Sequence, residues 1–196
     1  DCLLSRGLGD VYKRQNQDNM IEMPSALRGT DFAVNYTESD TGDIDRIWIL
    51  TADEAKKTLP LLPVLTTLDG KTINPASLRG KVLVISYFAS YCPFCANEAP
   101  KLQKLYSKNT DKLIVIGVNI ETKDPQQKEK AQQWVRKYQL THPVTTDFPA
   151  LERALGKRQG LPVNYVFDKR GMLRRVDVGE IFDEDFDDIA RFAQQD

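Results

Sequence analysis

Residues 82–88, Val-Leu-Val-Ile-Ser-Tyr-Phe, restrict the folds open to this chain more than any other stretch. The run is rich in β-branched and aromatic residues and is apolar at consecutive positions, which is typical of a strand buried on both faces. A second run of this kind occupies residues 113–119, and a helical pattern over residues 93–108 lies between the two. Strand, helix and strand at this spacing predict a parallel pair joined by a right-handed crossover.

The later periodic segments extend this unit into a mixed sheet. In chain order they predict helices over 124–138 and 148–155 with a short extended piece at 143–145 between them, a hairpin of 163–168 with 172–178, and a C-terminal helix over 183–193. We therefore predict an α/β fold in which helices cover both faces of a mixed central sheet.

The chain of 196 residues suits one domain preceded by an extension. Residues 1–15 resemble translated sequencing-adapter read-through, so we expect a non-native segment there. Residues 16–60 form an N-terminal extension to which the sequence assigns no role, and residues 61–196 form the main domain. Within the extension we expect strands near 32–36 and 44–50, a turn at 38–43, and a helix start with a capping box at 51–54.

The charge balance argues against two classes of partner. With 27 basic and 28 acidic residues the net charge is −1, so nothing predicts binding to nucleic acid or to an anionic membrane surface. No apolar run approaches the roughly 20 residues that a membrane span needs. The chain begins with Asp1 rather than Met, so we expect membrane attachment only through a missing N-terminal anchor.

A Cys-Pro-Phe-Cys motif, Cys92 to Cys95, stands where the first apolar strand meets the helix. Pro93 suits the first helical position, and free N–H groups at a helix N-terminus favour an anion. The thiolate form of Cys92, which is the nucleophile, is therefore favoured. Cys95 lies one turn further on and can attack the Cys92 sulfur once a mixed disulfide has formed. The motif predicts a redox-active dithiol in which Cys92 attacks and Cys95 resolves.

Other uses of two cysteines fit less well. A zinc site needs about four ligands, and outside the motif the sequence offers only Cys2 and His142 as further cysteine or histidine ligands. A structural disulfide here would close a very short loop and add little stability. Two inert core cysteines are the remaining alternative. We expect no metal and no cofactor beyond the Cys92–Cys95 disulfide itself.

The block from Gly80 to Pro100, with five shorter matches, resembles the TlpA/ResA-like branch of the thioredoxin superfamily, whose domain is of the redoxin or AhpC/TSA type. The shorter matches are Asp69-Gly70-Lys71, Leu78-Arg79-Gly80-Lys81, Gly117-Val118-Asn119, Leu161-Pro162 and Asp168-Lys169-Arg170-Gly171. The resemblance implies a thioredoxin-like fold over residues 61–195. It also implies a bacterial periplasmic or membrane-anchored protein that reduces protein disulfides, including those of apocytochromes, with electrons from an upstream thiol donor.

The resemblance also implies roles for individual residues. Pro162 matches a cis-proline that packs beside the dithiol and, with Leu161, contacts the substrate; an ordinary strand-entry proline is the alternative. Glu98 matches an active-site acid, and its alternative is a solvated helix acid paired with Lys101. The residues that flank Cys92, which are Tyr91, Pro93 and Phe94, are expected to contact substrate.

Several positions depart from the family pattern. Tyr91 replaces the usual Trp, Ser86 stands where thioredoxin has a buried acid, and Val163-Asn164 replaces small hydroxyl residues. The Pro93-Phe94 dipeptide resembles the glutaredoxin type, so the direction of electron flow stays open. His142 is the only histidine, and because its loop is not at the dithiol in the matching fold, we expect a structural role.

Three competing functions remain. A peroxiredoxin-like thiol peroxidase would place Thr or Ser three residues before its cysteine, where this chain has Ala89, and Pro where it has Ser86. A copper-delivery protein would have C-x-x-x-C spacing. A non-catalytic thioredoxin-fold binding module would not need an intact dithiol. We therefore expect a thiol–disulfide oxidoreductase, active in cytochrome maturation or general redox homeostasis.

Overall fold

The structure, a computed structural model, describes residues 3–4, 32–38, 44–157 and 160–194. Its contacts divide the chain into two compact units, residues 1–56 and 57–196. Each unit is described by itself below. Among the helices of the described residues, none is long and apolar enough to cross a membrane.

The first unit contains a small antiparallel sheet. Strands β1 (Leu3–Leu4), β2 (Phe32–Glu38) and β3 (Ile44–Thr51) pair in that order. Helix α2 (Ala52–Ala55) follows at once with the expected capping box: the Thr51 hydroxyl accepts from the Glu54 backbone N–H, and the Glu54 carboxylate accepts from the Thr51 N–H at 2.9 Å. Both predicted strands are confirmed, while most of the predicted turn (39–43), and residues 1–15 apart from Leu3–Leu4, lie outside the described residues.

The second unit is built on a mixed five-stranded sheet with the order β10-β9-β6-β7-β8. Strands β6, β7 and β8 are parallel, and β9 is antiparallel to both β6 and β10. The elements, in chain order, are η2 (Leu59–Leu61), β4 (Leu65–Thr66), β5 (Thr72–Ile73), η3 (Pro75–Leu78), β6 (Val82–Phe88), α3 (Pro93–Lys108), β7 (Leu113–Asn119), α4 (Gln127–Lys137), β8 (Val144–Thr145), α5 (Phe148–Leu155), β9 (Val163–Phe167), β10 (Leu173–Val178) and α6 (Asp183–Gln194).

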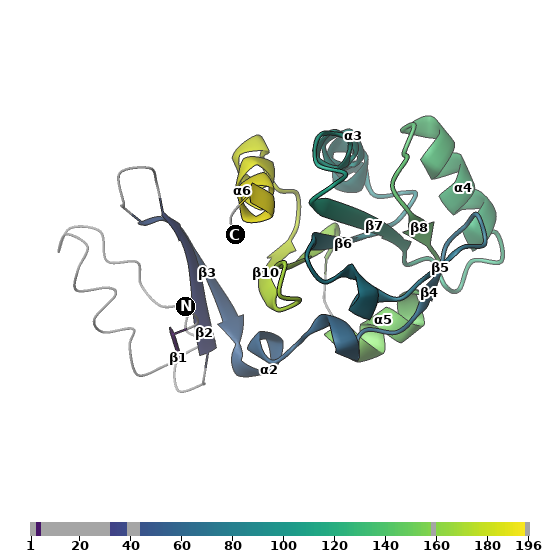
Figure 1. Cartoon of the computed structure of the whole chain (residues 1–196). Helices are drawn as coiled ribbons and strands as arrows, with labels where there is room; N and C mark the ends of the chain where they lie inside the picture. The colour runs from purple at the N-terminus through teal and green to yellow at the C-terminus, as the bar shows by residue number, and fades with distance from the viewer. Residues whose placement is uncertain (1–2, 5–31, 39–43, 158–159, 195–196) are drawn as a thin grey trace. The chain divides into compact units, whose positions relative to one another are not determined.

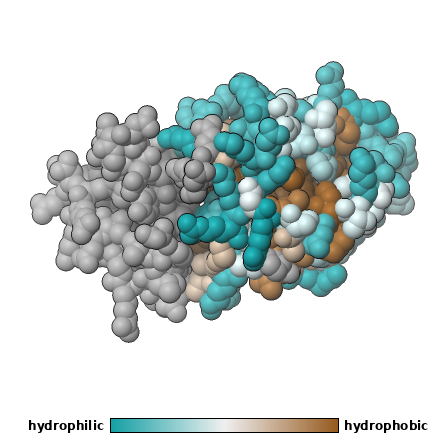
Figure 2. All heavy atoms as spheres, viewed as in Figure 1, coloured by the Kyte–Doolittle hydropathy of each residue, from teal (hydrophilic) through white to brown (hydrophobic). Residues whose placement is uncertain are grey.

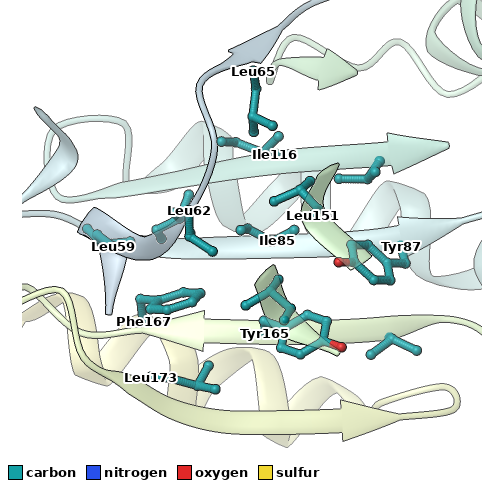
Figure 3. Close-up of a cluster of buried hydrophobic side chains, with 14 residues drawn as sticks. Leu59, Leu62, Leu65, Ile85, Tyr87, Ile116, Leu151, Tyr165, Phe167 and Leu173 are labelled. Carbon is teal, nitrogen blue, oxygen red and sulfur yellow. The ribbon is translucent and has the colours of Figure 1, made fainter. Parts of the chain in front are cut away.

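Helices cover both faces of this sheet, as predicted. Figure 1 shows α3 and α6 on one side of the strands and α5 on the other. Val82 and Val84 of β6 face α3 and α6, whereas Leu83 and Ile85 face the opposite side. On that opposite side, side chains from η2, α5 and five strands form one apolar cluster, whose labelled members gather over a single face of the sheet in Figure 3.

Strand β6 is the centre of the domain, because all its residues are buried between β7 and β9. Ser86 is its one polar residue, and its partners across the sheet are Gly117 on β7 and Asn164 on β9. Small side chains at Ser86 and Gly117 leave space under α3. The strand ends at Phe88, and a short loop then leads into α3, so the centre of the sheet delivers the cysteine motif to its carboxyl edge.

The start of the second unit is tied to β10. The Leu59 N–H donates to the Gly171 carbonyl at 2.9 Å, and the Leu173 N–H donates to the Lys57 carbonyl at 3.0 Å. The division between the units thus lies before Lys57, whereas the sequence pattern becomes regular only at Leu61. On the face shown in Figure 2, hydrophilic residues cover much of this unit and hydrophobic residues form a band between them.

Candidate active site

The dithiol lies at the N-terminus of α3, where the sequence predicts it. Cys92 is the N-cap residue, and its Sγ accepts a hydrogen bond from the Cys95 backbone N–H at 3.2 Å. The sulfur therefore takes the place of the hydroxyl or carboxylate oxygen that usually caps a helix. Pro93 occupies the first turn, and both thiols are free. The Cys92 sulfur thus occupies the helix N-terminus, a position where backbone N–H groups commonly bind anions.

Cys95 is the deeper of the two thiols. Its side chain is 2% exposed, against 6% for Cys92. Burial raises the pKa of Cys95, and the hydrogen bond with Cys92 and the negative charges of Cys92 and Glu98 raise it further. A thiol in this condition is a poor nucleophile until its proton is removed. Cys95 therefore needs a base close by.

Glu98 is a buried acid near this thiol. It is 1% exposed, one carboxylate oxygen accepts from Asn164 Nδ2 at 2.8 Å, and the other accepts from the Ile181 N–H at 3.3 Å. The alternative of a solvated acid paired with Lys101 is wrong, because Lys101 Nζ lies 3.1 Å from Asp183. Asn164, which replaces a small hydroxyl residue of the family, thus has a partner that the sequence did not suggest.

The environment of Glu98 sets its pKa near neutrality. Burial raises the pKa to about 7, the two hydrogen bonds oppose this, and the negative charges of Asp177 and Glu180 add to it. A carboxyl group that titrates near the operating pH is suited to accept and return a proton during a reaction.

The Leu161–Pro162 peptide bond is cis, as the resemblance implies. The carbonyl of Pro162 accepts from the Gly179 N–H at 2.8 Å, which fixes the proline loop to the end of β10. Leu161 is partly buried against the cluster that contains Cys92 and Cys95. The proline loop and the dithiol, distant in sequence, are therefore neighbours.

The residues that flank Cys92 are exposed. Tyr91 is 73% and Phe94 is 54% exposed, and Pro93 between Cys92 and Phe94 is exposed as well. The position of these side chains leaves them free to contact another molecule. Their predicted contact with substrate stays a prediction.

A cavity of about 20 Å³ lies beside Cys95. Its walls bring together Cys95, Glu98 and Pro162, which the sequence grouped, with Ser86 and His142. The remaining walls are mainly apolar and come from Phe88, Ala99, Leu102, Gly117, Trp134 and Leu140.

The expectation that His142 lies away from the dithiol is wrong. The Gly117 N–H donates to the Pro143 carbonyl at 2.9 Å, so the segment before β8 runs beside β7 under α3. Gly117 has no side chain, and a Cβ at that position would lie 3.3 Å from His142 Cε1. The imidazole therefore lies where a side chain on β7 would otherwise be, at the wall of the cavity.

Glu121 is a residue that sequence reasoning missed. Its carboxylate accepts from the Ser90 N–H at 2.7 Å, the Ser90 hydroxyl at 2.9 Å and Asn119 Nδ2 at 2.7 Å. Burial alone would raise the pKa of Glu121, but these bonds and the charge of Lys130 hold it below its ordinary value. The position of Glu121 just after β7 could have indicated its place near the dithiol, because the parallel strands β6 and β7 end at the same edge of the sheet.

Among the described residues, no group of three or more His, Cys, Asp or Glu side chains is placed to hold a metal ion.

Comparisons with known proteins agree with this arrangement. The profile of the AhpC/TSA family matches residues 55–176. The thioredoxin-like protein YneN of Bacillus subtilis is 27% identical over 115 residues, which are 59% of this chain and 66% of that protein. The thiol-disulfide oxidoreductase ResA of Bacillus cereus is 30% identical over 118 residues, 60% of this chain and 66% of that protein. The chain thus spans slightly less than two thirds of these relatives.

Solved structures show the same fold. A thiol:disulfide interchange protein of the thioredoxin family from Chlorobium tepidum has a TM-score of 0.60 at 27% identity, covering 71% of this chain and 97% of that one. A secreted thiol-disulfide isomerase from Corynebacterium glutamicum has a TM-score of 0.62 at 19% identity, covering 90% and 98%. The predicted thioredoxin-like fold and the resemblance to ResA-like proteins are confirmed, and since the family profile covers more than half of its residues, the chain belongs to the AhpC/TSA family.

Proposed function

We propose that this protein is a thiol–disulfide oxidoreductase that exchanges disulfides with partner proteins through Cys92 and Cys95. The observation that carries the proposal is the Cys92 sulfur at the N-terminus of α3, bonded to the Cys95 N–H, with the buried acid Glu98 and cis-Pro162 on the wall of the same cavity as Cys95. This combination supplies a nucleophile, a resolving thiol and a proton acceptor.

The exchange has two steps. The Cys92 thiolate attacks one sulfur of a substrate disulfide, the substrate S–S bond breaks, and the released substrate thiolate takes up a proton. Cys95 then loses its proton to Glu98, and its thiolate attacks the Cys92 sulfur of the mixed disulfide. The bond between Cys92 and the substrate breaks, a Cys92–Cys95 disulfide forms, and the second substrate sulfur leaves as a thiolate that is protonated. The substrate gains two electrons and the dithiol loses two.

The setting that we propose is the bacterial cell envelope. There the protein would act mainly as a reductase of protein disulfides, in cytochrome maturation or general redox homeostasis, and an upstream thiol donor would restore the dithiol. Relatives named as ResA-type oxidoreductases, and a structural neighbour described as secreted, support this assignment. The residues that we expect to contact the substrate are Tyr91, Pro93, Phe94, Leu161 and Pro162.

A thiol peroxidase is the second candidate, because the AhpC/TSA match admits it. The position three residues before Cys92 is Ala89, which is fully buried and has no hydroxyl to hold a peroxide. Disulfide exchange therefore fits the site better.

The first prediction tests the two cysteine roles by reduction of insulin disulfides. All proteins carry Cys2→Ser, so that only the dithiol reacts. We expect Cys92→Ala to abolish activity and Cys95→Ala to accumulate a mixed disulfide through Cys92. Equal activity in the parent and both variants would refute the mechanism, and faster consumption of hydrogen peroxide than of insulin disulfide would favour the peroxidase.

The direction of electron flow is tested separately, by the reduction potential of the Cys92–Cys95 pair. Known oxidoreductases span about −270 mV for thioredoxin to about −120 mV for a strong oxidant. A value near the lower end supports a reductase. A value near the upper end would assign the protein to disulfide formation instead.

A further inference from the structure

His142 has a buried nitrogen that the exchange mechanism does not use. The side chain is 5% exposed, and its Nδ1 lies 3.1 Å from the Pro143 carbonyl oxygen. A carbonyl oxygen only accepts, so Nδ1 must carry the proton, and in the neutral ring Nε2 is then an acceptor. Nε2 is buried and has no hydrogen-bond partner among the described residues. A buried acceptor without a partner is unfavourable, so this nitrogen calls for an explanation.

The cavity beside His142 has room for one water molecule. Its volume is about 20 Å³, and about 10–15 Å³ of this kind of space holds a water with two to four polar partners. The polar groups on its walls come from different elements: Ser86 from β6, Cys95 and Glu98 from α3, and His142 from the segment before β8. Phe88 and Trp134 are among the apolar residues that line the same cavity.

Cys95 and Glu98 are not directly bonded to each other. Among the hydrogen bonds of the described residues, the Glu98 carboxylate accepts from Asn164 and Ile181, and none joins it to the Cys95 sulfur. Both residues line the same cavity. A proton that passes from Cys95 to Glu98 therefore needs a bridging group inside it.

We propose that His142 Nε2 holds a water molecule in this cavity and that this water carries the Cys95 proton to Glu98. The inference rests on the proposed exchange through Cys95. The water donates one hydrogen to His142 Nε2 and the other to the Glu98 carboxylate, and its oxygen accepts from the Cys95 S–H. As the thiol proton moves to the water oxygen, the water proton on the Glu98 side moves to the carboxylate, so the water is regenerated and no electrons are exchanged in this step.

His142 is thus a positioning residue rather than the base. Burial lowers the pKa of His142 to about 4, so the ring stays neutral and its Nε2 stays an acceptor at neutral pH. The ionisable groups around the relay are Cys92 beside Cys95, Asp177 and Glu180 beside Glu98, and Tyr106, whose ring lies 6.0 Å from that of His142. The proton therefore goes to Glu98, whose pKa is about 7.

The test measures the reactions of the two thiols separately. It uses dithiobis(nitrobenzoate) as the disulfide and a protein that carries Cys2→Ser. The first nitrothiobenzoate released reports attack by Cys92, and the second reports attack by Cys95 on the mixed disulfide. We expect His142→Phe, which keeps a ring but removes the acceptor, to slow the second release about tenfold at pH 7, the order of one lost hydrogen bond. The first release should not change. His142→Gln, which restores an acceptor, should recover most of the rate.

The pH profile distinguishes positioning from packing. In the parent protein the second release should rise around pH 7, as Glu98 loses its proton, and His142→Phe should lose this rise. An unchanged second release in His142→Phe, or equal slowing in His142→Phe and His142→Gln, would overturn the proposal. These readouts need no protein substrate, so failure of the parent to reduce insulin would reject the proposed function and leave this test intact.

A measurement on the parent protein covers the case in which the variants fail to fold. His142 is the only histidine, so its side-chain ¹⁵N signals need no assignment by mutation. We expect a neutral ring with the proton on Nδ1 and an Nε2 signal shifted by hydrogen bonding. An Nε2 signal typical of an unbonded imidazole nitrogen would overturn the proposal.

Discussion

Glu98 shows how the surroundings of one residue link stability to pH. Its pKa is about 7 in the folded protein, against an ordinary value of 4.5. The folded state therefore keeps a proton on Glu98 that the unfolded chain has already lost between these two values. The stabilising effect of that proton is complete below pH 4.5 and disappears as the pH rises through 7. The charged carboxylate then destabilises the fold, by ~3 kcal/mol for a pKa difference of this size.

The second prediction follows from this loss of stability as the pH rises. Glu98→Gln mimics the protonated acid, so its free energy of unfolding at pH 8 should exceed that of the parent by up to ~3 kcal/mol, and the difference should vanish near pH 4. Its disulfide reductase activity should fall by about 10²-fold, because the base is gone. Urea unfolding at the two pH values and insulin reduction check this. The exposed Glu129→Gln is the matched control, and a parent-like pH dependence of stability in Glu98→Gln would contradict the prediction.

At the scale of single residues, the sequence predicts the positions of those side chains whose surroundings are set by local structure, and it fails for those set by contacts with distant segments. Cys92 and Cys95 follow from spacing at a strand–helix junction, which is local information. The spacing of Glu98 fits both an active-site acid and a solvated helix acid, and only the resemblance indicated the active-site acid. The sequence placed His142 wrongly because its position depends on a bond between Gly117 and Pro143, which joins two distant segments. Contacts of this kind leave no periodic signal.

The connection between β6 and α3 is the element that carries the nucleophile, and Glu121 holds it. The Glu121 carboxylate accepts hydrogen bonds from both the backbone N–H and the hydroxyl of Ser90, two residues before Cys92. Its pKa is lowered, so this interaction is present at neutral pH and is lost as the pH falls through the depressed value. The loop is therefore anchored to the end of the neighbouring strand β7.

The third prediction concerns this anchor. Glu121→Ala leaves the Ser90 N–H and Asn119 without their acceptor, so the protein should lose ~2–3 kcal/mol of unfolding free energy. Alkylation of Cys92 by iodoacetamide at pH 7 should slow, because the loop that holds the Cys92 sulfur at the N-terminus of α3 loses its anchor. Glu121→Gln retains one oxygen, so its alkylation rate should lie between those of the parent and of Glu121→Ala. Alkylation rates identical to the parent in both variants would show that the loop holds its conformation without Glu121.

Elements with a strong internal pattern are predicted well. The bounds of β6, α3, β7 and α5 agree with those expected from apolar periodicity and caps. Helix α4 starts at Gln127 rather than Asp124, because Asp124 Oδ1 accepts from the Gln126 N–H at 2.8 Å and closes a turn first. The two-residue strand β8 is defined by its pairing with β7 and by a bridge between Thr145 and Thr67, which are contacts with distant segments, so the sequence indicated only a short extended piece.

At the scale of the whole chain, the second unit has a core and a sheet of its own. Leu59 is fully buried in the apolar cluster of Figure 3, although it precedes the regular part of the sequence. Gly171, which has a φ of 81°, packs against Leu59 and also accepts its N–H hydrogen bond. The few residues before Leu62 are thus part of this fold, and the family profile, which begins at residue 55, includes them.

The fourth prediction compares two fragments that differ only at this start. Residues 57–196 should fold, unfold in one cooperative transition and reduce insulin at the rate of the whole chain, because the dithiol, Glu98 and Pro162 are all retained. Residues 62–196 lack Leu59 and the backbone bonds to Gly171 and Leu173, and loss of a buried leucine with its surroundings costs ~2–5 kcal/mol. This fragment should therefore unfold at a clearly lower urea concentration. Equal midpoints would place the true start of the domain at about residue 62, close to the residue 61 that the sequence pattern alone indicates, and would reduce residues 57–61 to a surface attachment.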